Sequence, residues 1–221
     1  MNPPISSSRN ATSGERPSSI VYILDDDELT RAALASLLKS LGVHAETFDT
    51  SSTFLAHIRP PVPSCLVLDV RLRGESGLAL QRQFADGALR IPIVFVTGYG
   101  DVAMSVMAMK AGAIDFLTKP FRDQDMLDAV SRALSEDAKR LMSESRTSLV
   151  RRCFETLTPR ERQVMHHVVT GMLNKEIAEK LALSEITVKI HRGRMMRKME
   201  ARSVADLVRK SAIVADFPFR I

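Results

Sequence analysis

The sequence has no tryptophan, only two cysteines and no apolar run long enough to span a membrane. A membrane-spanning helix needs about 20 mostly apolar residues. The first nineteen residues are rich in Ser and Pro and lack the apolar segment of a secretory signal. Cys65 and Cys153 are far apart and have no partners at metal-ligand spacing, which argues against a disulfide scaffold or a structural zinc site. These absences predict a cytoplasmic protein that does not associate with membranes.

The 221 residues, 45% of them hydrophobic and 26% charged, suit a globular protein of two modest domains. The net charge of +5 is unevenly distributed along the chain. Residues 1–140 carry 15 Lys and Arg against 17 Asp and Glu, whereas residues 141–221 carry 16 against 9. The basic last third indicates either a polyanionic partner such as nucleic acid or a solvated basic surface, and charge alone does not choose between them.

Short β-branched runs alternate with helical patterns after residue 19. Residues 1–19 are predicted to be a disordered tail, because they hold too little apolar area to offset the entropy of ordering. Strands are predicted at 20–25, 43–48, 65–69, 91–96 and 113–117, and helices near 27–41, 51–58, 76–85, 101–110 and 123–138. Five strand–helix repeats predict an α/β fold over residues 20–138, a (βα)5 doubly wound parallel sheet with the flavodoxin-like order 2-1-3-4-5.

No strand pattern recurs beyond that point. Residues 139–152 are polar and charged, which predicts a helical or flexible linker. Four helices are then expected, at about 159–170, 174–181, 185–199 and 203–214. Thr158 and Glu161 have the spacing of a capping box at the start of the first of them. Residues 153–221 are therefore predicted to form an all-α domain.

Polar residues stand at the C-terminal ends of four predicted strands. They are Asp25, Asp26 and Asp27 after the first, Asp69 at the third, Thr97 after the fourth and Lys119 after the fifth. These strand ends meet at one edge of a parallel sheet, where ligands bind. Carboxylates so close together need a counter-charge, which Mg²⁺ with oxygen ligands supplies. The pattern predicts an acidic Mg²⁺ pocket in which Lys119 and the Thr97 hydroxyl face a phosphoryl group.

Simpler roles exist for each of these residues alone. The three consecutive aspartates can cap a helix, Asp69 can merely start a loop, and Lys119 can be a surface charge. An enzyme is a further alternative, a Mg²⁺-dependent phosphatase of the haloacid dehalogenase class. That class needs Asp-x-Asp-x-Thr/Val, whereas Leu29 takes the last position here. The conjunction at four strand ends favours the phosphoryl pocket, and we expect no enzyme.

Residues 20–138 resemble the receiver domain of bacterial two-component response regulators. The matching segments are ILDDD, LVLDVRL, FVTGYG and DFLTKPF, at the first, third, fourth and fifth strands. The resemblance implies that a sensor histidine kinase transfers a phosphoryl group to Asp69, which becomes an aspartyl phosphate. It implies that Mg²⁺ binds to Asp25, Asp26, Asp69 and the backbone carbonyl of Arg71, and that Asp27 starts the following helix.

The same resemblance implies a switch. Thr97 and Lys119 are expected to contact the phosphoryl group, Phe116 to turn inward on activation, and the Lys119–Pro120 bond to be cis. Thr97 and Phe116 would then reshape the surface that includes helix 101–110. This helix is unusually apolar, with Val102, Met104, Val106, Met107 and Met109. Core packing accounts for some of these side chains, and a dimer contact is the open alternative for the rest.

The segment from residue 174 has helix-turn-helix spacing, with a break at 182–184 and a second helix from Glu185. Val188, His191, Met195 and Met199 form one stripe of the second helix, which predicts its inward face. The opposite side carries Ile186, Lys189, Ile190, Gly193, Arg194 and Arg197. Close approach of another backbone would explain the mid-helix Gly193. A basic helix alone is usually a solvated face, but the turn and the glycine together predict a helix that enters a DNA groove.

Residues 153–215 resemble LuxR/NarL-type DNA-binding domains, in particular the FixJ branch of response regulators. The segments LTPRERQV, GMLNKEIAEKLALSEITVKIHRGRMMRKM and ARSVADLV carry the resemblance. It implies a recognition helix over 185–198 and a helix at 203–211 that pairs subunits on DNA. We expect Lys189, Ile190 and Arg194 to reach base edges, Thr187, Arg192 and Arg197 to hold phosphates, and Gly193 to lie against the DNA.

Together the two resemblances predict a transcriptional regulator switched by phosphorylation of Asp69. Its expected partners are a sensor histidine kinase, double-stranded promoter DNA, RNA polymerase and a second copy of the phosphorylated chain. Activation of transcription is expected by analogy. The remaining alternative is a constitutive DNA-binding regulator whose receiver takes no phosphate.

Overall fold

The structure, a computed structural model, describes residues 17–40, 42–87 and 89–214. Residues 1–16 of the expected tail and residues 215–221 lie outside the described part. The chain divides into two compact units between Leu141 and Met142, and each unit is described by itself. No helix within the described residues is long and apolar enough to cross a membrane.

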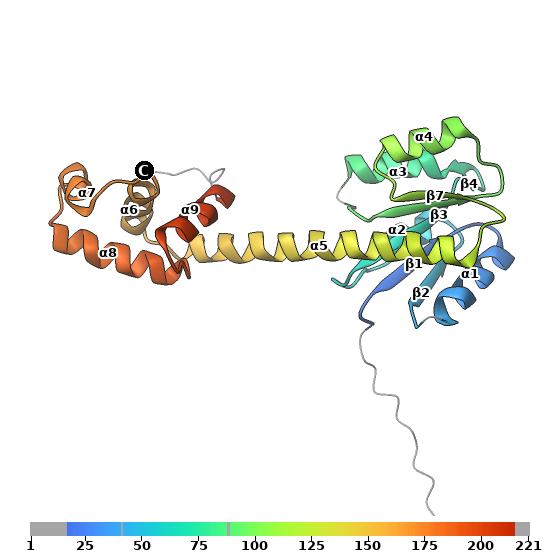
Figure 1. Cartoon of the computed structure of the whole chain (residues 1–221), viewed down its shortest axis with the longest axis horizontal. Coiled ribbons are helices and arrows are strands. Elements are labelled where there is room, and N and C mark those ends of the chain that lie inside the picture. The colour runs from blue at the N-terminus through green and yellow to red at the C-terminus, as the bar shows by residue number, and fades with distance from the viewer. Residues whose placement is uncertain (1–16, 41, 88, 215–221) are drawn as a thin grey trace, which may run out of the picture. The chain divides into compact units, whose positions relative to one another are not determined.

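The first unit is built on a five-stranded parallel sheet (Figure 1). Its strands are β1 (Ile20–Leu24), β2 (His44–Phe48), β3 (Ser64–Asp69), β6 (Ile93–Thr97) and β7 (Asp115–Thr118). They pair in the order β2-β1-β3-β6-β7, which confirms the predicted topology. A two-residue hairpin, β4 (Arg71–Leu72) and β5 (Glu75–Ser76), follows β3. The sequence pattern did not predict this hairpin, because two-residue strands have no periodicity.

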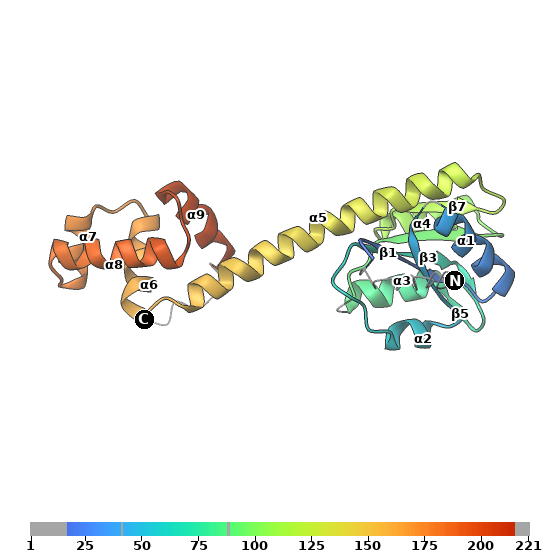
Figure 2. The same ribbon diagram turned by 90° about the horizontal axis from the view of Figure 1, so that it is seen from below.

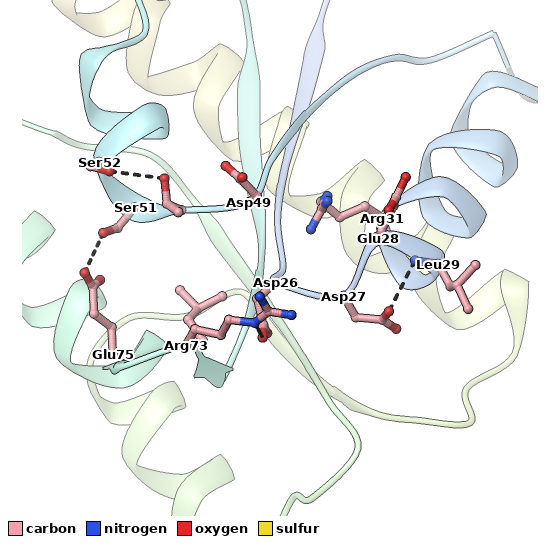
Figure 3. Close-up of a pocket in the computed structure, with 12 residues that line it drawn as sticks. Asp26, Asp27, Glu28, Leu29, Arg31, Asp49, Ser51, Ser52, Arg73 and Glu75 are labelled. Atoms are coloured by element: carbon pink, nitrogen blue, oxygen red, sulfur yellow. Dashed lines mark hydrogen bonds and ion pairs between the residues drawn. The ribbon is translucent and has the colours of Figure 1, made fainter.

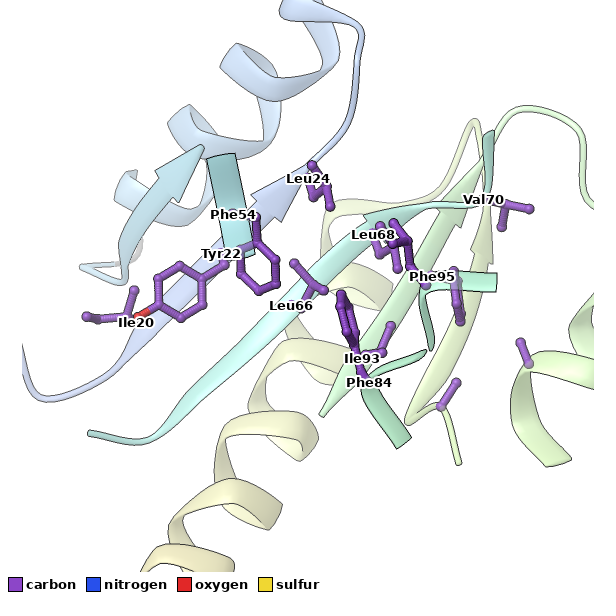
Figure 4. Close-up of a cluster of buried hydrophobic side chains, with 13 residues drawn as sticks. Ile20, Tyr22, Leu24, Phe54, Leu66, Leu68, Val70, Phe84, Ile93 and Phe95 are labelled. Atoms are coloured by element: carbon purple, nitrogen blue, oxygen red, sulfur yellow. The ribbon is translucent and has the colours of Figure 1, made fainter. Parts of the chain in front are cut away.

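Helices cover both faces of this sheet, as the continuously apolar central strands require. They are α1 (Glu28–Ser40), α2 (Ser51–Ala56), α3 (Gly77–Asp86), α4 (Val102–Lys110) and α5 (Asp123–Glu155). One core packs α2, α3 and α4 against side chains such as Tyr22, Leu66 and Phe95 (Figure 4). The other packs α1 and α5 against the opposite side chains of the same strands, such as Val21 and Val67.

The sequence left open whether residues 139–152 form a helix or a flexible linker, and helix α5 answers this question. It runs without a break from Asp123 to Glu155, so residues 139–152 are helical. Asp137 of this helix has a fully buried carboxylate in the first unit. That carboxylate accepts hydrogen bonds from the backbone N–H of Ser64 at 2.9 Å and from Arg140 Nε at 2.8 Å. The hydrogen bond to Ser64 attaches α5 to the N-terminal end of β3.

The second unit contains α6 (Pro159–Val169), α7 (Asn174–Leu181), α8 (Glu185–Lys198) and α9 (Val204–Ile213) (Figure 2). Thr158 and Glu161 form the predicted capping box at the start of α6. Helix α7 ends at Ala182, which has a left-handed φ of 51° and turns the chain into α8. Buried side chains from all four helices, including Val164, Ile177, Val188 and Leu207, form one core. This arrangement confirms the predicted all-α domain.

Candidate functional site

A lysine joins two carboxylates at the C-terminal edge of the sheet. Lys119 Nζ donates to Asp25 Oδ2 at 2.9 Å and to Asp69 Oδ2 at 3.2 Å. Asp25 follows β1, Asp69 ends β3, and Lys119 follows β7, so three parallel strands bring together residues that are up to 94 positions apart. The bond from Lys119 to Pro120 is cis, as predicted.

Burial and neighbouring charges shift the pKa values of Asp69 and Lys119 in this site. Burial and the neighbouring Asp25 charge raise the pKa of Asp69 above its ordinary value, against the hydrogen bond from the Arg71 N–H and the charge of Lys119. Burial alone would lower the pKa of Lys119, but the carboxylates of Asp25 and Asp69 outweigh it and raise that pKa. Lys119 is therefore a permanent cation at neutral pH between two carboxylates.

The other expected acids have distinct surroundings. Asp27 caps α1, since its carboxylate accepts the N–H groups of Leu29 and Thr30 and the Thr30 hydroxyl. Asp26 is the most exposed of the expected metal-binding carboxylates, with 27% of its side chain accessible. Its Oδ2 lies 3.3 Å from Nε of Arg73, a residue that the sequence analysis did not single out.

The residues expected to bind Mg²⁺ have suitable chemistry. Asp25, Asp26 and Asp69 offer hard carboxylate oxygens, and Lys119 is paired with only two of them. Among the described residues no three His, Cys, Asp or Glu side chains form a preformed metal cage. Mg²⁺ needs none, because it keeps several waters and uses only one or two carboxylates. The residues therefore fit this ion.

Thr97 ends β6, whereas Phe116 is the second residue of β7 and pairs with Phe95, two residues before Thr97. Thr97 is buried, and its hydroxyl oxygen accepts the N–H of Tyr99 at 3.3 Å. Phe116 is half-buried and packs 6.1 Å from the ring of Phe95, centroid to centroid. Gly100 allows this packing, since a Cβ there would stand 2.9 Å from Phe116 Cε1 and 3.2 Å from Thr97 Cγ2.

Two exposed side chains pack against each other two residues after Asp69 and Thr97. The Arg71 guanidinium stacks on the Tyr99 ring, 4.6 Å from its centroid. The backbone N–H of Arg71 donates to Asp69 Oδ1 at 2.9 Å, and that of Tyr99 donates to the Thr97 hydroxyl. Each residue of the stack is thus attached to one of the predicted phosphoryl-contacting residues.

A cavity of about 700 Å³ lies beside Asp26 (Figure 3). It is lined by the start of α1, the start of α2 and the β4–β5 hairpin. Arg73 points to Asp26, and Ser51 donates to Glu75 of the same hairpin at 2.9 Å. The sequence pattern did not predict Arg73, Glu75 or Ser51 as site residues. The Arg73-Gly74 turn was the available signal, and Gly74 indeed has φ +79°.

Helix α8 separates its side chains as expected. Val188, Met195 and Met199 are fully buried, while His191 is only half-buried. The residues exposed on its outer face are Ile186, Lys189, Ile190, Gly193, Arg194 and Arg197. A Cβ on Gly193 would meet no atom of the described residues within 4 Å, so no backbone in that part of the chain explains the glycine.

Two of the expected phosphate-binding residues have partners within the domain. Thr187 is half-buried and its hydroxyl lies 2.8 Å from that of Ser184, the N-cap of α8. Arg192 NH1 donates to Asn174 Oδ1 at 2.8 Å, which joins α8 to the start of α7. The exposed cations of α8 are Lys189, Arg194 and Arg197.

The fold and these two sites define a class of protein: a regulator with an acidic pocket at the sheet edge of one unit and a helix-turn-helix in the other. Comparison with known families agrees. Residues 21–131 match the family described as "Response regulator receiver domain". Residues 155–211 match "Bacterial regulatory proteins, luxR family". The chain therefore belongs to the FixJ/NarL family of two-component response regulators and is a DNA-binding transcriptional regulator.

Individual relatives cover nearly the whole chain. Nodulation protein W of Bradyrhizobium diazoefficiens is 50% identical over 192 residues, which cover 87% of this chain and 85% of that protein. The response regulator protein TodT of Pseudomonas putida is 44% identical over 198 residues, 90% of this chain and 87% of that protein. Among solved structures, the response regulator StyR is 45% identical, with a TM-score of 0.80 and coverage of 88% and 98%.

Proposed function

We propose that Asp69 is the residue phosphorylated by a sensor histidine kinase, and that this event controls DNA binding. The observation that carries the proposal is the Lys119 ammonium between Asp25 and Asp69 at the end of buried parallel strands. In the transfer, an Asp69 oxygen forms a bond to phosphorus as the phosphorus–nitrogen bond of the phosphohistidine breaks. The released imidazole leaves with the electron pair and takes up a proton.

The surrounding side chains suit this chemistry. Lys119 already lies within hydrogen-bond distance of Asp69, so its ammonium can neutralise an incoming phosphoryl oxygen. Thr97 accepts a hydrogen bond from Tyr99, which leaves its own hydroxyl proton to donate. Asp25, Asp26 and Asp69, with the carbonyl of Arg71, would hold Mg²⁺, and the bound ion would supply further positive charge for the phosphoryl group.

The exposed face of α4 supports dimerisation as the output. Met104 packs into the core, whereas Val102, Val106, Met107 and Met109 are exposed. Four exposed apolar residues on one short helix are costly in water and suit a contact with a second copy. In this proposal Thr97 and Phe116 move on phosphorylation and change the surface that includes α4.

Helix α8 is proposed to enter the DNA major groove. Lys189, Ile190 and Arg194 would reach base edges, while Thr187, Arg192 and Arg197 would hold phosphates and Gly193 would allow close approach. Paired recognition helices in a dimer raise the effective concentration of the second helix at its half-site. We propose that the bound dimer acts in the cytoplasm, contacts RNA polymerase and activates transcription, without being an enzyme.

Intact mass measurement tests the proposal. The full chain is incubated with Mg²⁺ and acetyl phosphate, and wild type is compared with Asp69→Asn, while light scattering reports the oligomeric state. We expect one phosphoryl adduct and dimer formation in wild type, and neither in the variant. An adduct that persists in Asp69→Asn, or no adduct in wild type, would reject Asp69 as the acceptor and favour phosphate-independent DNA binding.

A further inference from the structure

The carboxylates at the strand ends are unequally neutralised by the protein itself. Both oxygens of Asp25 are used, Oδ1 by the Asp27 N–H at 2.8 Å and Oδ2 by Lys119. Both oxygens of Asp69 are used as well, Oδ1 by the Arg71 N–H and Oδ2 by Lys119. The positive group next to Asp26 is instead Arg73, with Nε 3.3 Å from Oδ2.

Arg73 reaches Asp26 from a well-anchored hairpin. The base of the hairpin is held by the Arg71 N–H on Asp69, by the Gly77 N–H on the Val70 carbonyl at 2.9 Å, and by Ser51 on Glu75. The Arg73 side chain itself is 87% exposed. A fixed backbone with a free side chain allows the guanidinium to move without rearranging the hairpin.

The cavity beside Asp26 gives the guanidinium a place to go. Arg73 lines this cavity of about 700 Å³ together with the carboxylates of Asp49 and Glu75 (Figure 3). A guanidinium that leaves Asp26 therefore stays in a cavity whose acidic lining residues outnumber its other cation, Arg31. A divalent cation on Asp26, by contrast, would repel a guanidinium that remained in contact with the same carboxylate.

We infer that Arg73 is a built-in counter-charge of Asp26, which a divalent cation must displace into the adjacent cavity in order to bind. Arg73 thereby lowers the affinity of the acidic pocket for Mg²⁺ and stabilises the metal-free protein. The inference rests on the proposed function, because it takes the Asp25, Asp26 and Asp69 cluster as the Mg²⁺ site.

Two measurements on the full chain test this role with Arg73→Gln. Arg90→Gln is the matched control, since it removes the same charge from an exposed position three residues before β6, at the opposite edge of the sheet. In the first measurement, MgCl₂ is added stepwise at low ionic strength, and its binding is followed by NMR through the backbone amide signals of Asp26 and Asp27. Exposed ion pairs are weak, so we expect Arg73→Gln to bind Mg²⁺ about two- to five-fold more tightly than wild type. Arg90→Gln should match wild type.

The second measurement is thermal unfolding with and without the ion. Without Mg²⁺, Arg73→Gln should unfold about 1–3 °C below wild type, because Asp26 has lost its counter-charge. At saturating Mg²⁺ this difference should disappear. The role of Arg73 would be overturned, with the metal site intact, by either of two results. All three proteins could bind Mg²⁺ with equal affinity, or Arg73→Gln and Arg90→Gln could change the affinity by the same factor. Failure of wild type to bind Mg²⁺ would overturn the metal site and this inference together.

Discussion

Lys198 at the end of α8 donates a hydrogen bond to the buried carboxylate of Glu161 in the first turn of α6, with Nζ 2.7 Å from Oε2. The same ammonium donates to the Thr156 carbonyl at 3.0 Å, and the Glu161 carboxylate also accepts the Thr158 N–H at 2.8 Å. One ion pair thus fixes the C-terminal end of the proposed recognition helix against the segment that precedes α6.

Glu161→Gln should destabilise the helical unit by about 1–3 kcal/mol, because it weakens a buried, charge-assisted hydrogen-bond network. Hydrogen exchange of α6 amides in the full chain measures this change. Glu179→Gln, at an exposed position of α7, is the control and should have little effect. Equal protection factors in both variants would contradict a stabilising role for the pair.

The same carboxylate should make the stability of this unit depend on pH. Burial pushes the pKa of Glu161 up, but hydrogen bonds from Lys198 and Thr158 outweigh it and hold the pKa below its ordinary value. A lowered carboxyl pKa stabilises the fold above the unfolded-state pKa of about 4.3, and this stabilisation is lost as the pH falls through the folded-state pKa. Acid titration of unfolding should show this loss in wild type and a flatter profile in Glu161→Gln.

Gly77 should be irreplaceable at the start of α3. A Cβ there would stand 2.3 Å from the Asp69 carbonyl oxygen, which belongs to the backbone and cannot rotate away. Gly77→Ala should cost about 1–3 kcal/mol of stability and slow phosphorylation by acetyl phosphate, because Asp69 must shift. Gly98→Ala is the control, since a Cβ at Gly98 meets no atom within 4 Å. Similar phosphorylation rates in the two variants would argue against the crowding.

The Arg71–Tyr99 stack should lengthen the lifetime of the aspartyl phosphate. Both residues are attached through their backbone N–H groups to Asp69 and Thr97, and their side chains stack 4.6 Å apart next to them. Removing the cation–π contact opens the site to water, so Arg71→Ala should shorten the half-life by about two- to five-fold. Loss of the adduct with time by intact mass measures this. An unchanged half-life in Arg71→Ala and Tyr99→Ala would contradict the covering role.

Replacement of Ala182 by glycine should raise the stability of the helical unit. Its φ of 51° is a left-handed conformation that disfavours residues with a Cβ. Ala182→Gly should stabilise the helical unit by about 0.5–1 kcal/mol. Glu179→Gly, inside α7, should destabilise it by about 1 kcal/mol. Denaturant unfolding followed by NMR signals of α7 and α8 tests the opposite signs, and two changes of the same sign would reject the argument.

Two cations of α8 should affect DNA binding differently. Arg197→Ala should weaken binding to all sequences and reduce the slope of log affinity against log salt by about 1. Lys189→Ala should cost about 1–3 kcal/mol on the preferred site and relax its sequence preference. Fluorescence anisotropy on specific and random duplexes at several salt concentrations separates the two effects. A loss of preference in Arg197→Ala with no change in Lys189→Ala would reverse the assignment.

Much of the fold was predictable because its signals are local. The buried strands β1, β3 and β6 are continuous apolar runs, and α6, α8 and α9 each begin after a capping Thr or Ser. The β4–β5 hairpin and the continuation of α5 to Glu155 were not predictable in the same way. A two-residue strand has no period, and a polar helix resembles a polar linker in sequence.

The sequence by itself determined which residues stand at the strand ends and which face of α8 is basic, since both follow from chain order and periodicity. Only the tertiary structure decided how charges pair across the chain. Lys119 joins Asp25 and Asp69, Asp137 attaches α5 to Ser64, and Arg73 turns to Asp26. These pairs depend on distances of a few ångströms between distant segments, which sheet order and hairpin geometry set and local sequence patterns do not encode.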